Sequence, residues 1–373
     1  MAYLGENIPK LGFGLMRLPM IGDEVDIEQV KQMADRFIAA GFTYFDTAYG
    51  YINGKSEEAV KPVLVDRYPR EAFQLATKLP AWAGPKTAEE AQQMFYTSLR
   101  RTGAGYFDFY LLHNLGDSRT KSFDDFGIWD FVKARKVEGL IRHIGFSMHS
   151  TPEELEQVLT LHPEVEFVQL QINYADWENP SVQSRACYEV CRRFGKPVVI
   201  MEPVKGGNLA NLPESVASVF RKADPTVSQS SWALRFAASL DGLVTVLSGM
   251  SNLQQMDDNL NTMKEFRPLS DDERKIIAEA VAAMDALDKI PCTGCSYCTK
   301  GCPMQINIPG AFGAMNLLLT YGNENGAKGD YRWNTREGGK ASDCLACGQC
   351  EAACPQHIGI IDELKRIAET LEV

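Results

Sequence analysis

The sequence predicts an α/β protein made of a (β/α)8 TIM barrel and a small, mainly helical C-terminal domain. From Lys10 to Phe266, short apolar or β-branched runs alternate with longer segments of helical period, a pattern typical of repeated βα units around a parallel sheet. Such a barrel usually takes about 250 residues, which matches this stretch. Eight of the ten cysteines then lie between Cys292 and Cys354, which indicates a separate domain.

Eight strands and eight helices are expected to alternate along the barrel. The strands are predicted at Leu11–Leu18, Tyr44–Ala48, Phe73–Lys78, Phe107–His113, His143–Ser147, Phe167–Asn173, Pro197–Glu202 and Val244–Gly249. The helices are predicted at 27–39, 56–67, 87–102, 124–136, 152–161, 181–194, 228–240 and 252–264. An open doubly wound sheet is the alternative fold. It normally has G-x-G-x-x-G after its first strand, however, and Gly12–Arg17 (GFGLMR) lacks the third glycine.

The pattern changes after Phe266. Ser270 followed by Asp271, Asp272 and Glu273 is typical of a capped helix start and predicts a helix to about Asp288. We therefore expect a barrel domain at 1–268, a linking helix at 269–290 and a cysteine-rich domain at 291–373. Within the last domain, the Gly- and Asn-rich stretch at 322–340 predicts a loop.

Charge and composition exclude several classes of protein. The formal net charge of −11 argues against binding to nucleic acid or to an anionic membrane, because both need a basic patch. The segment Met1–Asn7 has no basic region followed by an apolar stretch, and no run is long enough to cross a bilayer. We expect a cytoplasmic protein, in which crowded cysteines indicate a metal site rather than disulfides.

The cysteines form two runs of the same spacing, C-x2-C-x2-C-x3-C-P. Three thiolates in such a tight loop converge on one iron–sulfur cubane, and the fourth follows at a helix-like offset and points elsewhere. The runs are Cys292, Cys295, Cys298 and Cys302, and then Cys344, Cys347, Cys350 and Cys354. Two zinc sites are the alternative, but a regular third and fourth cysteine, present twice, favours clusters. Cys187 and Cys191 lie in a predicted helix and are expected to be ordinary buried side chains.

This spacing resembles that of the bacterial two-cluster ferredoxins, in which the fourth cysteine of each run binds the other cluster. The resemblance implies two [4Fe-4S] clusters. The first would be held by Cys292, Cys295, Cys298 and Cys354, and the second by Cys344, Cys347, Cys350 and Cys302. The connection between the runs is longer than in a ferredoxin, which makes this domain a variant.

Four chemically active side chains follow three neighbouring strands of the predicted barrel. Asp46 and Tyr51 follow the second strand, Lys78 ends the third and His113 ends the fourth. Barrel enzymes place their chemistry at the carboxyl ends of the strands, so these residues are expected to meet in one site.

In their sequence context, these residues resemble the catalytic tetrad of the aldo-keto reductase family. The matching segments are Phe45–Ala48 with Tyr51, Ala76–Lys78, Leu111–His113, Gly139–Ser147, Val168–Tyr174, and Ser248–Ser251 with Asn259. The resemblance implies reduction of a carbonyl by hydride, which leaves an alkoxide that needs a proton. A free tyrosine, with a pKa near 10, is a poor acid, but Lys78 would lower that pKa, with Asp46 holding Lys78 in place. His113 would polarise the substrate oxygen.

The resemblance also implies an NAD(P) site. Ser147 and Gln169 would bind the carboxamide, and the phosphates would lie near Lys205–Gly207 and Ser248–Ser251. The full set of expected cofactor contacts is Met16, Arg17, Asp46, Ser147, His149, Gln169, Glu202, Lys205, Gly206, Gly207, Ser248, Gly249, Met250, Ser251, Gln255 and Asn259. Met148 and His149 follow Ser147 where many members have asparagine. Gln255 stands where many have an arginine for the 2′-phosphate, which weakens the case for NADP over NAD.

The leading hypothesis is an oxidoreductase of aldo-keto reductase type that acts on a small carbonyl-type substrate. Its clusters would connect the barrel to a ferredoxin or another redox partner protein. Hydride carries two electrons and a cluster passes one, so a flavin would be a suitable converter, and the sequence neither identifies nor excludes one. Two alternatives are a self-sufficient NAD(P)H carbonyl reductase with structural clusters and a non-catalytic electron-transfer subunit. The substrate and the partner are not determined.

Overall fold

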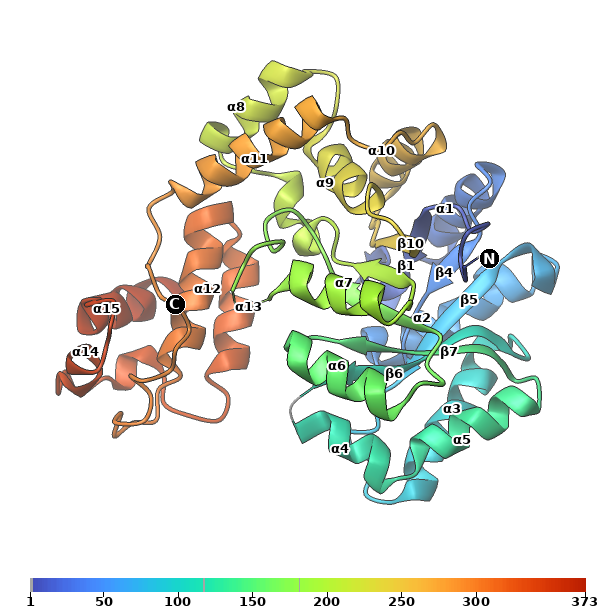
Figure 1. Cartoon of the computed structure of the whole chain (residues 1–373), viewed down its shortest axis with the longest axis horizontal. Helices are drawn as coiled ribbons and strands as arrows, with labels where there is room; N and C mark the ends of the chain where they lie inside the picture. The colour runs from blue at the N-terminus through green and yellow to red at the C-terminus, as the bar shows by residue number, and fades with distance from the viewer. Residues whose placement is uncertain (1–2, 117, 181) are drawn as a thin grey trace. The chain divides into compact units, whose positions relative to one another are not determined.

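The computed structural model describes residues 3–116, 118–180 and 182–373. The chain divides into two compact units, whose elements are drawn in Figure 1. The barrel unit comprises Met1–Gly206 and Ser230–Arg274, and the cysteine unit comprises Gly207–Gln229 and Lys275–Val373. Residues 207–229, which were expected to belong to the barrel domain, therefore group with the cysteine unit. The domain boundaries expected from the sequence stay predictions.

Eight parallel strands form a closed barrel in the order β1-β10-β9-β8-β7-β6-β5-β4, which confirms the predicted fold class. Their bounds are β1 Leu11–Gly14, β4 Tyr44–Asp46, β5 Gln74–Leu79, β6 Phe107–Leu115, β7 Ile141–Met148, β8 Phe167–Gln171, β9 Val198–Met201 and β10 Leu243–Ser248. Each strand overlaps its predicted range. The ring closes through β1, where Phe13 pairs with Phe45 of β4 and with Ser248 of β10.

The first strand is shorter than the predicted Leu11–Leu18. It ends at Gly14, which pairs with Asp46, the last residue of β4, so no neighbouring strand continues beyond it. The chain then forms the 3-10 helix η1, Leu15–Arg17, and a small antiparallel ribbon of β2 (Met20–Ile21) and β3 (Glu24–Val25) that the sequence did not predict.

Helices separate successive barrel strands, as expected. Their bounds are α1 Ile27–Ala39, α2 Lys55–Val60 with the π-helical turn η3 Lys61–Val65, α3 Ala88–Thr102, α4 Ser118–Asp125, α5 Ile128–Val137, α6 Pro152–Leu161, α7 Ser184–Arg193, α9 Gln229–Ala238 and α10 Leu253–Lys264. The predicted helix at 124–136 is two helices, because Gly127 lies between them with a left-handed φ of 61°. The predicted helix at 181–194 starts at Ser184, and residue 181 lies outside the described residues.

Large side chains fill the interior of the barrel, so only its rim can hold a site. The interior cluster consists of Tyr44, Ala76, Phe109, Leu111, Phe167, Val199, Val244 and Leu247. Glycine is needed where one of these side chains lies against the backbone of a neighbouring strand. A Cβ at Gly145 would lie 2.6 Å from the ring of Phe167. A packed interior is normal for this fold, whose chemistry lies at the carboxyl ends of the strands.

The cysteine unit is mainly helical, as predicted. Its helices are α8 Glu214–Ala223, α11 Asp271–Asp285, which begins in the barrel unit, α12 Ile308–Tyr321, α13 Glu324–Asn334, α14 Gln349–Ala352 and α15 Ile360–Leu371. The predicted start of α11 is confirmed: the Glu273 carboxylate accepts from Ser270 N, and the Ser270 hydroxyl accepts from Glu273 N. No helix among the described residues is long and apolar enough to span a membrane.

The loop predicted at 322–340 is wrong, because α13 lies within it. Gly322, with a φ of 65°, ends α12, and the Asn323 side chain caps α13 by accepting from Gly326 N. One turn later in the helix, Ala327 and Tyr331 are both buried on the same face. Burial of that face outweighs the low helix propensity of the glycines.

Candidate functional site

Lys78 lies at the centre of the predicted tetrad. Its Nζ donates to Asp46 Oδ1 at 2.5 Å, to the Thr47 carbonyl at 2.8 Å and to the Tyr51 hydroxyl at 3.3 Å. Lys78 and Asp46 are almost fully buried, with exposed fractions of 1% and 3%. The ring of His113 packs edge-on against that of Tyr51 at 5.9 Å between centroids. The structure therefore brings the four residues together.

Strand register explains this convergence. Asp46 of β4 pairs with Ala76 of β5, and Lys78 is two residues further, so both side chains point to the same face. Lys78 in turn pairs with Leu111 of β6, and His113 follows two residues later. Alternation along paired strands places the three side chains at one edge of the barrel.

Tyr51 comes from η2 (Tyr51–Gly54), a turn in an unusual conformation. Ile52, Asn53 and Gly54 have φ values of 51°, 54° and 91°, in the left-handed region. A β-branched residue rarely adopts this region, so Ile52 is held there against its preference. The strain lies immediately next to the predicted proton donor, which indicates that the fold fixes the position of Tyr51.

An ion pair between Arg101 and Glu57 lies next to this turn and fixes the backbone before it. Arg101 of α3 donates to the Tyr49 carbonyl at 3.0 Å and to Glu57 Oε2 at 3.1 Å, and Thr77 donates to Glu57 Oε1 at 2.7 Å. A Cβ at Gly54 would lie 2.7 Å from the Arg101 guanidinium. Gly54 is therefore required both by its backbone conformation and by this contact.

Burial and charge set the protonation states of the tetrad. Burial raises the pKa of Tyr51 above its usual range, and the opposing effect of Lys78 only reduces that rise. Burial would lower the pKa of Lys78, but Asp46 and Tyr51 together raise it. Burial, with a contribution from Lys78, holds the pKa of His113 well below its ordinary value. At neutral pH the site therefore contains a protonated phenol, an ammonium group and a neutral imidazole.

This arrangement is suited to giving one proton to a developing alkoxide. The Tyr51 hydroxyl carries the proton, and the Lys78 ammonium stabilises the phenolate that remains. Nδ1 of His113 is buried and has no hydrogen-bond partner among the described residues. A neutral imidazole next to the phenol can orient a polar substrate atom without competing for the proton.

Most of the expected phosphate contacts gather at the ends of β1 and β10. The Ser251 hydroxyl donates to the Arg17 carbonyl at 2.7 Å, and Asn259 Nδ2 donates to the Ser248 hydroxyl at 2.7 Å. The Gln255 Oε1 accepts from Ser251 N at 2.8 Å. Gly206 and Gly249 lie near the Arg17 side chain. A Cβ added at Gly206 would be 3.1 Å from Arg17 Nη2, and a Cβ added at Gly249 would be 3.5 Å from Arg17 Cδ. Met16 is exposed, Met250 is buried, and Gly207 belongs to the cysteine unit.

The expected carboxamide contacts lie at the ends of β7 and β8. The Ser147 hydroxyl accepts from Asn114 N at 2.8 Å, and Gln169 Nε2 donates to Asp46 Oδ2 at 3.4 Å. Gln169 Oε1 is buried without a partner among the described residues, which leaves a free acceptor beside the tetrad. His149 Nδ1 lies 3.1 Å from Gln171 Oε1.

Asp176 is the centre of a network that the sequence analysis missed. Its Oδ2 accepts from Gln171 Nε2 and Asn173 Nδ2, each at 2.8 Å, and its Oδ1 pairs with Lys205 Nζ at 2.5 Å. Asn173 also donates to the carbonyl of Glu202, which has a φ of 53°. Gln171 and Asn173 continue the alternation begun by Gln169, and this spacing was the available signal. Lys205, expected as a phosphate contact, forms an ion pair with Asp176, and the expected contact stays a prediction.

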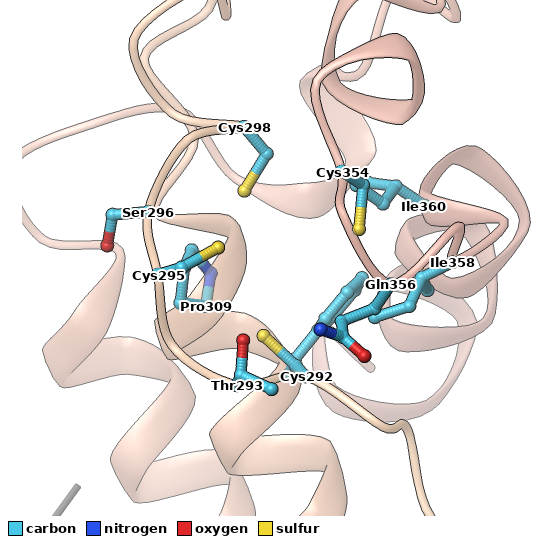
Figure 2. A pocket seen from close by; sticks show the side chains of 11 residues that line it. Cys292, Thr293, Cys295, Ser296, Cys298, Pro309, Cys354, Gln356, Ile358 and Ile360 are labelled. Carbon is cyan, nitrogen blue, oxygen red and sulfur yellow. The ribbon is translucent and has the colours of Figure 1, made fainter.

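The cysteine thiols gather in two separate cavities, and none of the ten cysteines forms a disulfide. Cavity 1 is lined by Cys292, Cys295, Cys298 and Cys354, and Figure 2 shows their four sulfur atoms pointing into a common space. Cavity 2 is lined by Cys302, Cys344, Cys347 and Cys350. Each cavity combines three thiols of one run with the last thiol of the other, and thiolates are the ligands that iron–sulfur clusters take.

Two further observations concern metal binding. Among the described residues, no group of three or more His, Cys, Asp or Glu side chains is arranged to hold a single ion. Cys187 and Cys191 are buried in α7, as predicted, and burial raises the pKa of Cys187 to about 11. Neither of these two thiols lines cavity 1 or cavity 2.

Two family descriptions match the chain. The "Aldo/keto reductase family" matches residues 10–282, and the "4Fe-4S dicluster domain" matches residues 291–358. Among curated proteins, an uncharacterized oxidoreductase of Schizosaccharomyces pombe is 26% identical over 263 residues, which are 68% of this chain and 81% of the relative. An aldo-keto reductase of Mycobacterium sp. (strain KMS) is 25% identical over 260 residues, 69% of this chain and 84% of the relative.

Solved structures resemble the barrel part of the chain. An aldo-keto reductase from Bacillus halodurans in its holo form has a TM-score of 0.61 and 25% identity, covering 75% of this chain and 95% of that protein. An aldo-keto reductase from Klebsiella pneumoniae in complex with NADPH has a TM-score of 0.57 and 20% identity, with the same coverage. At that identity the second likeness concerns the fold alone.

Proposed function

The chain belongs to the aldo/keto reductase family and carries a 4Fe-4S dicluster domain, and from this premise we propose that its barrel reduces the carbonyl group of a small molecule with NAD(P)H. One observation carries the proposal: the buried Lys78 ammonium contacts both the Asp46 carboxylate and the Tyr51 hydroxyl. This is the arrangement that protonation of an alkoxide by a tyrosine requires.

Each tetrad residue has a distinct role in this proposal. Tyr51 donates the proton to the substrate oxygen, and Lys78 stabilises the resulting phenolate. Asp46 keeps Lys78 charged and in place, and neutral His113 orients the substrate oxygen. NAD(P)H, when bound, supplies the hydride.

We propose that Ser147 and Gln169 hold the carboxamide of the cofactor, and that Arg17 with Ser248–Ser251 receives its phosphates. The free acceptor at Gln169 Oε1 supports the first assignment, because the carboxamide nitrogen is a donor. The Arg17 side chain supports the second, with its guanidinium beside Gly206 and its aliphatic stem beside Gly249, since arginine binds phosphate through a planar fork. Nothing in the described residues supports a flavin.

We also propose that cavity 1 and cavity 2 each hold one [4Fe-4S] cluster through their four thiols. The crossed arrangement of the runs supports this ligation, because it is the one the two-cluster ferredoxin spacing implies. The free thiols are in keeping with a reducing compartment such as the cytoplasm.

In this proposal the clusters pass single electrons to or from a redox partner protein. The observation that supports this role is that the dicluster domain and the reductase barrel belong to one chain. The two clusters together can take the two electrons of one NAD(P)H, one electron each, so adding NADH or NADPH to the anaerobic, oxidised protein, with and without a carbonyl substrate, should change the electron paramagnetic resonance signal of the clusters. A signal that responds to neither compound contradicts electron transfer and leaves the clusters a structural role.

Replacing Tyr51 by Phe tests the reductase. We expect Tyr51→Phe to lower kcat/KM for a panel of aldehydes and ketones by about 10²–10⁴-fold, the usual contribution of a general acid. The loss should appear mainly in kcat, because the phenol acts in the transition state.

Tyr106→Phe is the matched control. The Tyr106 hydroxyl accepts from Arg142 at 2.7 Å just before the start of β6, at the opposite end of the barrel. Its removal should leave kcat/KM within about twofold. Equal rates for Tyr51→Phe and the parent protein would contradict the proposed role of Tyr51, and no turnover of any carbonyl by the parent would contradict the reductase itself.

A further inference from the structure

The two cysteine runs have the same backbone conformation, although their sequences differ. Counted from the first cysteine of each run, left-handed residues occur at the same places. Gly294 and Ala346 have φ values of 72° and 50°, Ser296 and Gly348 of 59° and 74°, and Gln305 and His357 both of 53°. The two cavities are therefore built by equivalent loops.

The thiols of the two runs are also equally shielded from solvent. Cys298 and Cys350 are buried, with exposed fractions of 7% and 8%, whereas Cys295 and Cys347 are both exposed. The first and fourth cysteines of both runs are intermediate. Differences in solvent exposure therefore do not distinguish the two sites.

Side chains at equivalent positions in the two cavities do differ. Thr293 and Gln356 line cavity 1, whereas their counterparts in cavity 2 are Leu345 and Met304. Figure 2 shows the Thr293 hydroxyl and the Gln356 amide beside Cys292, at the edge of the space enclosed by the sulfur atoms. Apart from its cysteines, cavity 2 is lined only by Pro, Met, Ile and Leu. Hydrogen-bond donors are thus available to a cluster in cavity 1 from side chains that cavity 2 lacks.

Charged residues within the two runs do not distinguish the cavities. Glu351 follows Cys350, and its carboxylate is held there by accepting from Ile361 N at 2.9 Å. The counterpart of Glu351 after Cys298 is Thr299, and the next residue in that run is Lys300. Glu351 lies between Cys350 of cavity 2 and Cys354 of cavity 1, and Lys300 lies between Cys298 of cavity 1 and Cys302 of cavity 2, so neither charge belongs to one cavity alone.

We infer that the cluster in cavity 1 has a higher reduction potential than the cluster in cavity 2. Reduction adds negative charge to the cluster, and hydrogen-bond donors to its sulfur atoms, which side chains supply in cavity 1 and not in cavity 2, stabilise that charge. The first electron added to the oxidised protein then resides in cavity 1. When an electron passes from cavity 2 to cavity 1, the cluster in cavity 2 is oxidised and the cluster in cavity 1 is reduced, by one electron each. The inference rests on the proposed ligation of both clusters.

Reciprocal exchange of the two differing pairs tests the inference. The full chain is purified anaerobically and titrated with dithionite, and each cluster is followed by electron paramagnetic resonance. In the parent protein we expect two separate transitions. Thr293→Leu with Gln356→Met should shift the higher transition to more negative potential. Leu345→Thr with Met304→Gln should shift the lower transition to more positive potential, so that both exchanges reduce the separation.

Ser296→Ala is the matched control, because Figure 2 shows the Ser296 hydroxyl pointing away from the sulfur atoms. It should move neither transition. The inference is overturned if the first exchange moves only the lower transition, or if an exchange that retains both clusters moves neither one. If one exchange prevents cluster assembly, the other exchange decides. It overturns the inference if it moves only the transition that it should leave unchanged, or if it moves neither transition. A parent protein without iron and sulfide would instead contradict the proposed ligation.

Discussion

Lys78 is a buried charge, and its surroundings explain why the fold tolerates it. An unpaired ammonium group inside a protein costs several kcal/mol, but this one is ion-paired with Asp46 at 2.5 Å and bonded to the Thr47 carbonyl at 2.8 Å. Its third contact, to the Tyr51 hydroxyl, places the charge beside the atom that loses a proton in the proposed reaction. The same three contacts thus satisfy the buried lysine and prepare the proposed chemistry.

The protonation states predict a simple pH profile for carbonyl reduction. Tyr51 must be protonated, and its raised pKa keeps it so until the pH exceeds the usual tyrosine value of about 10. His113, with its lowered pKa, stays neutral through the range near pH 6.5 where histidine ordinarily titrates. We expect kcat/KM to be flat between about pH 6 and 9 and to fall only at higher pH. A titration step near pH 7 that disappears in Tyr51→Phe would contradict these assignments.

Single residues differed in how well the sequence predicted them. The tetrad was predictable, because each member lies at or just after the end of a strand. Lys78 acts to lower the pKa of Tyr51, as predicted. The predicted net lowering is wrong, because burial of the phenol raises that pKa by more. The partner of Lys205 was not predictable, because Asp176 is far from it in the chain and only the folded barrel brings them together.

The turn η2 is the element on which the position of Tyr51 depends, and Gly54→Ala tests it. A side chain at a φ of 91° and 2.7 Å from Arg101 should destabilise the protein by about 1–3 kcal/mol. It should also lower kcat/KM, because the turn must move. Urea denaturation and steady-state rates measure the two effects.

Gly41→Ala separates backbone strain from the contact with Arg101. Gly41 has nearly the same φ, 88°, but nothing lies within 4 Å of its added Cβ. We expect a smaller loss of stability and an unchanged kcat/KM. Equal effects of the two substitutions on activity would show that Arg101 does not position the turn.

The regular elements were predictable where a periodic apolar pattern was long. All eight barrel strands overlap their expected ranges, because buried parallel strands give continuous apolar runs. Glycine was an unreliable signal for the ends of helices. Gly127 divides a predicted helix, whereas Gly326 lies inside α13, where a loop was predicted. Glycine alone does not determine whether a helix ends, since burial of neighbouring residues decides the outcome.

For the chain as a whole, the division into units was the least predictable feature. Residues 207–229 follow β9 in the sequence but group with the cysteine unit. Nothing in their composition marks this, because the grouping depends on contacts such as the one from Asn323 Nδ2 to Asn208 Oδ1 at 2.6 Å. The cysteine pattern, by contrast, was local and specific. The two cavities group the same thiols as the pairing it implied, and the ligation itself stays a prediction.

The content of iron and acid-labile sulfide in the anaerobically purified chain is the decisive determination. Two cubanes predict about eight iron atoms and about eight sulfides per chain, with no stoichiometric zinc. Replacing Cys302 or Cys354 by serine should lower the iron content, since each of these thiols completes the cavity built by the other run. A colourless parent protein that binds zinc, or that contains neither iron nor sulfide, would contradict the two-cluster account.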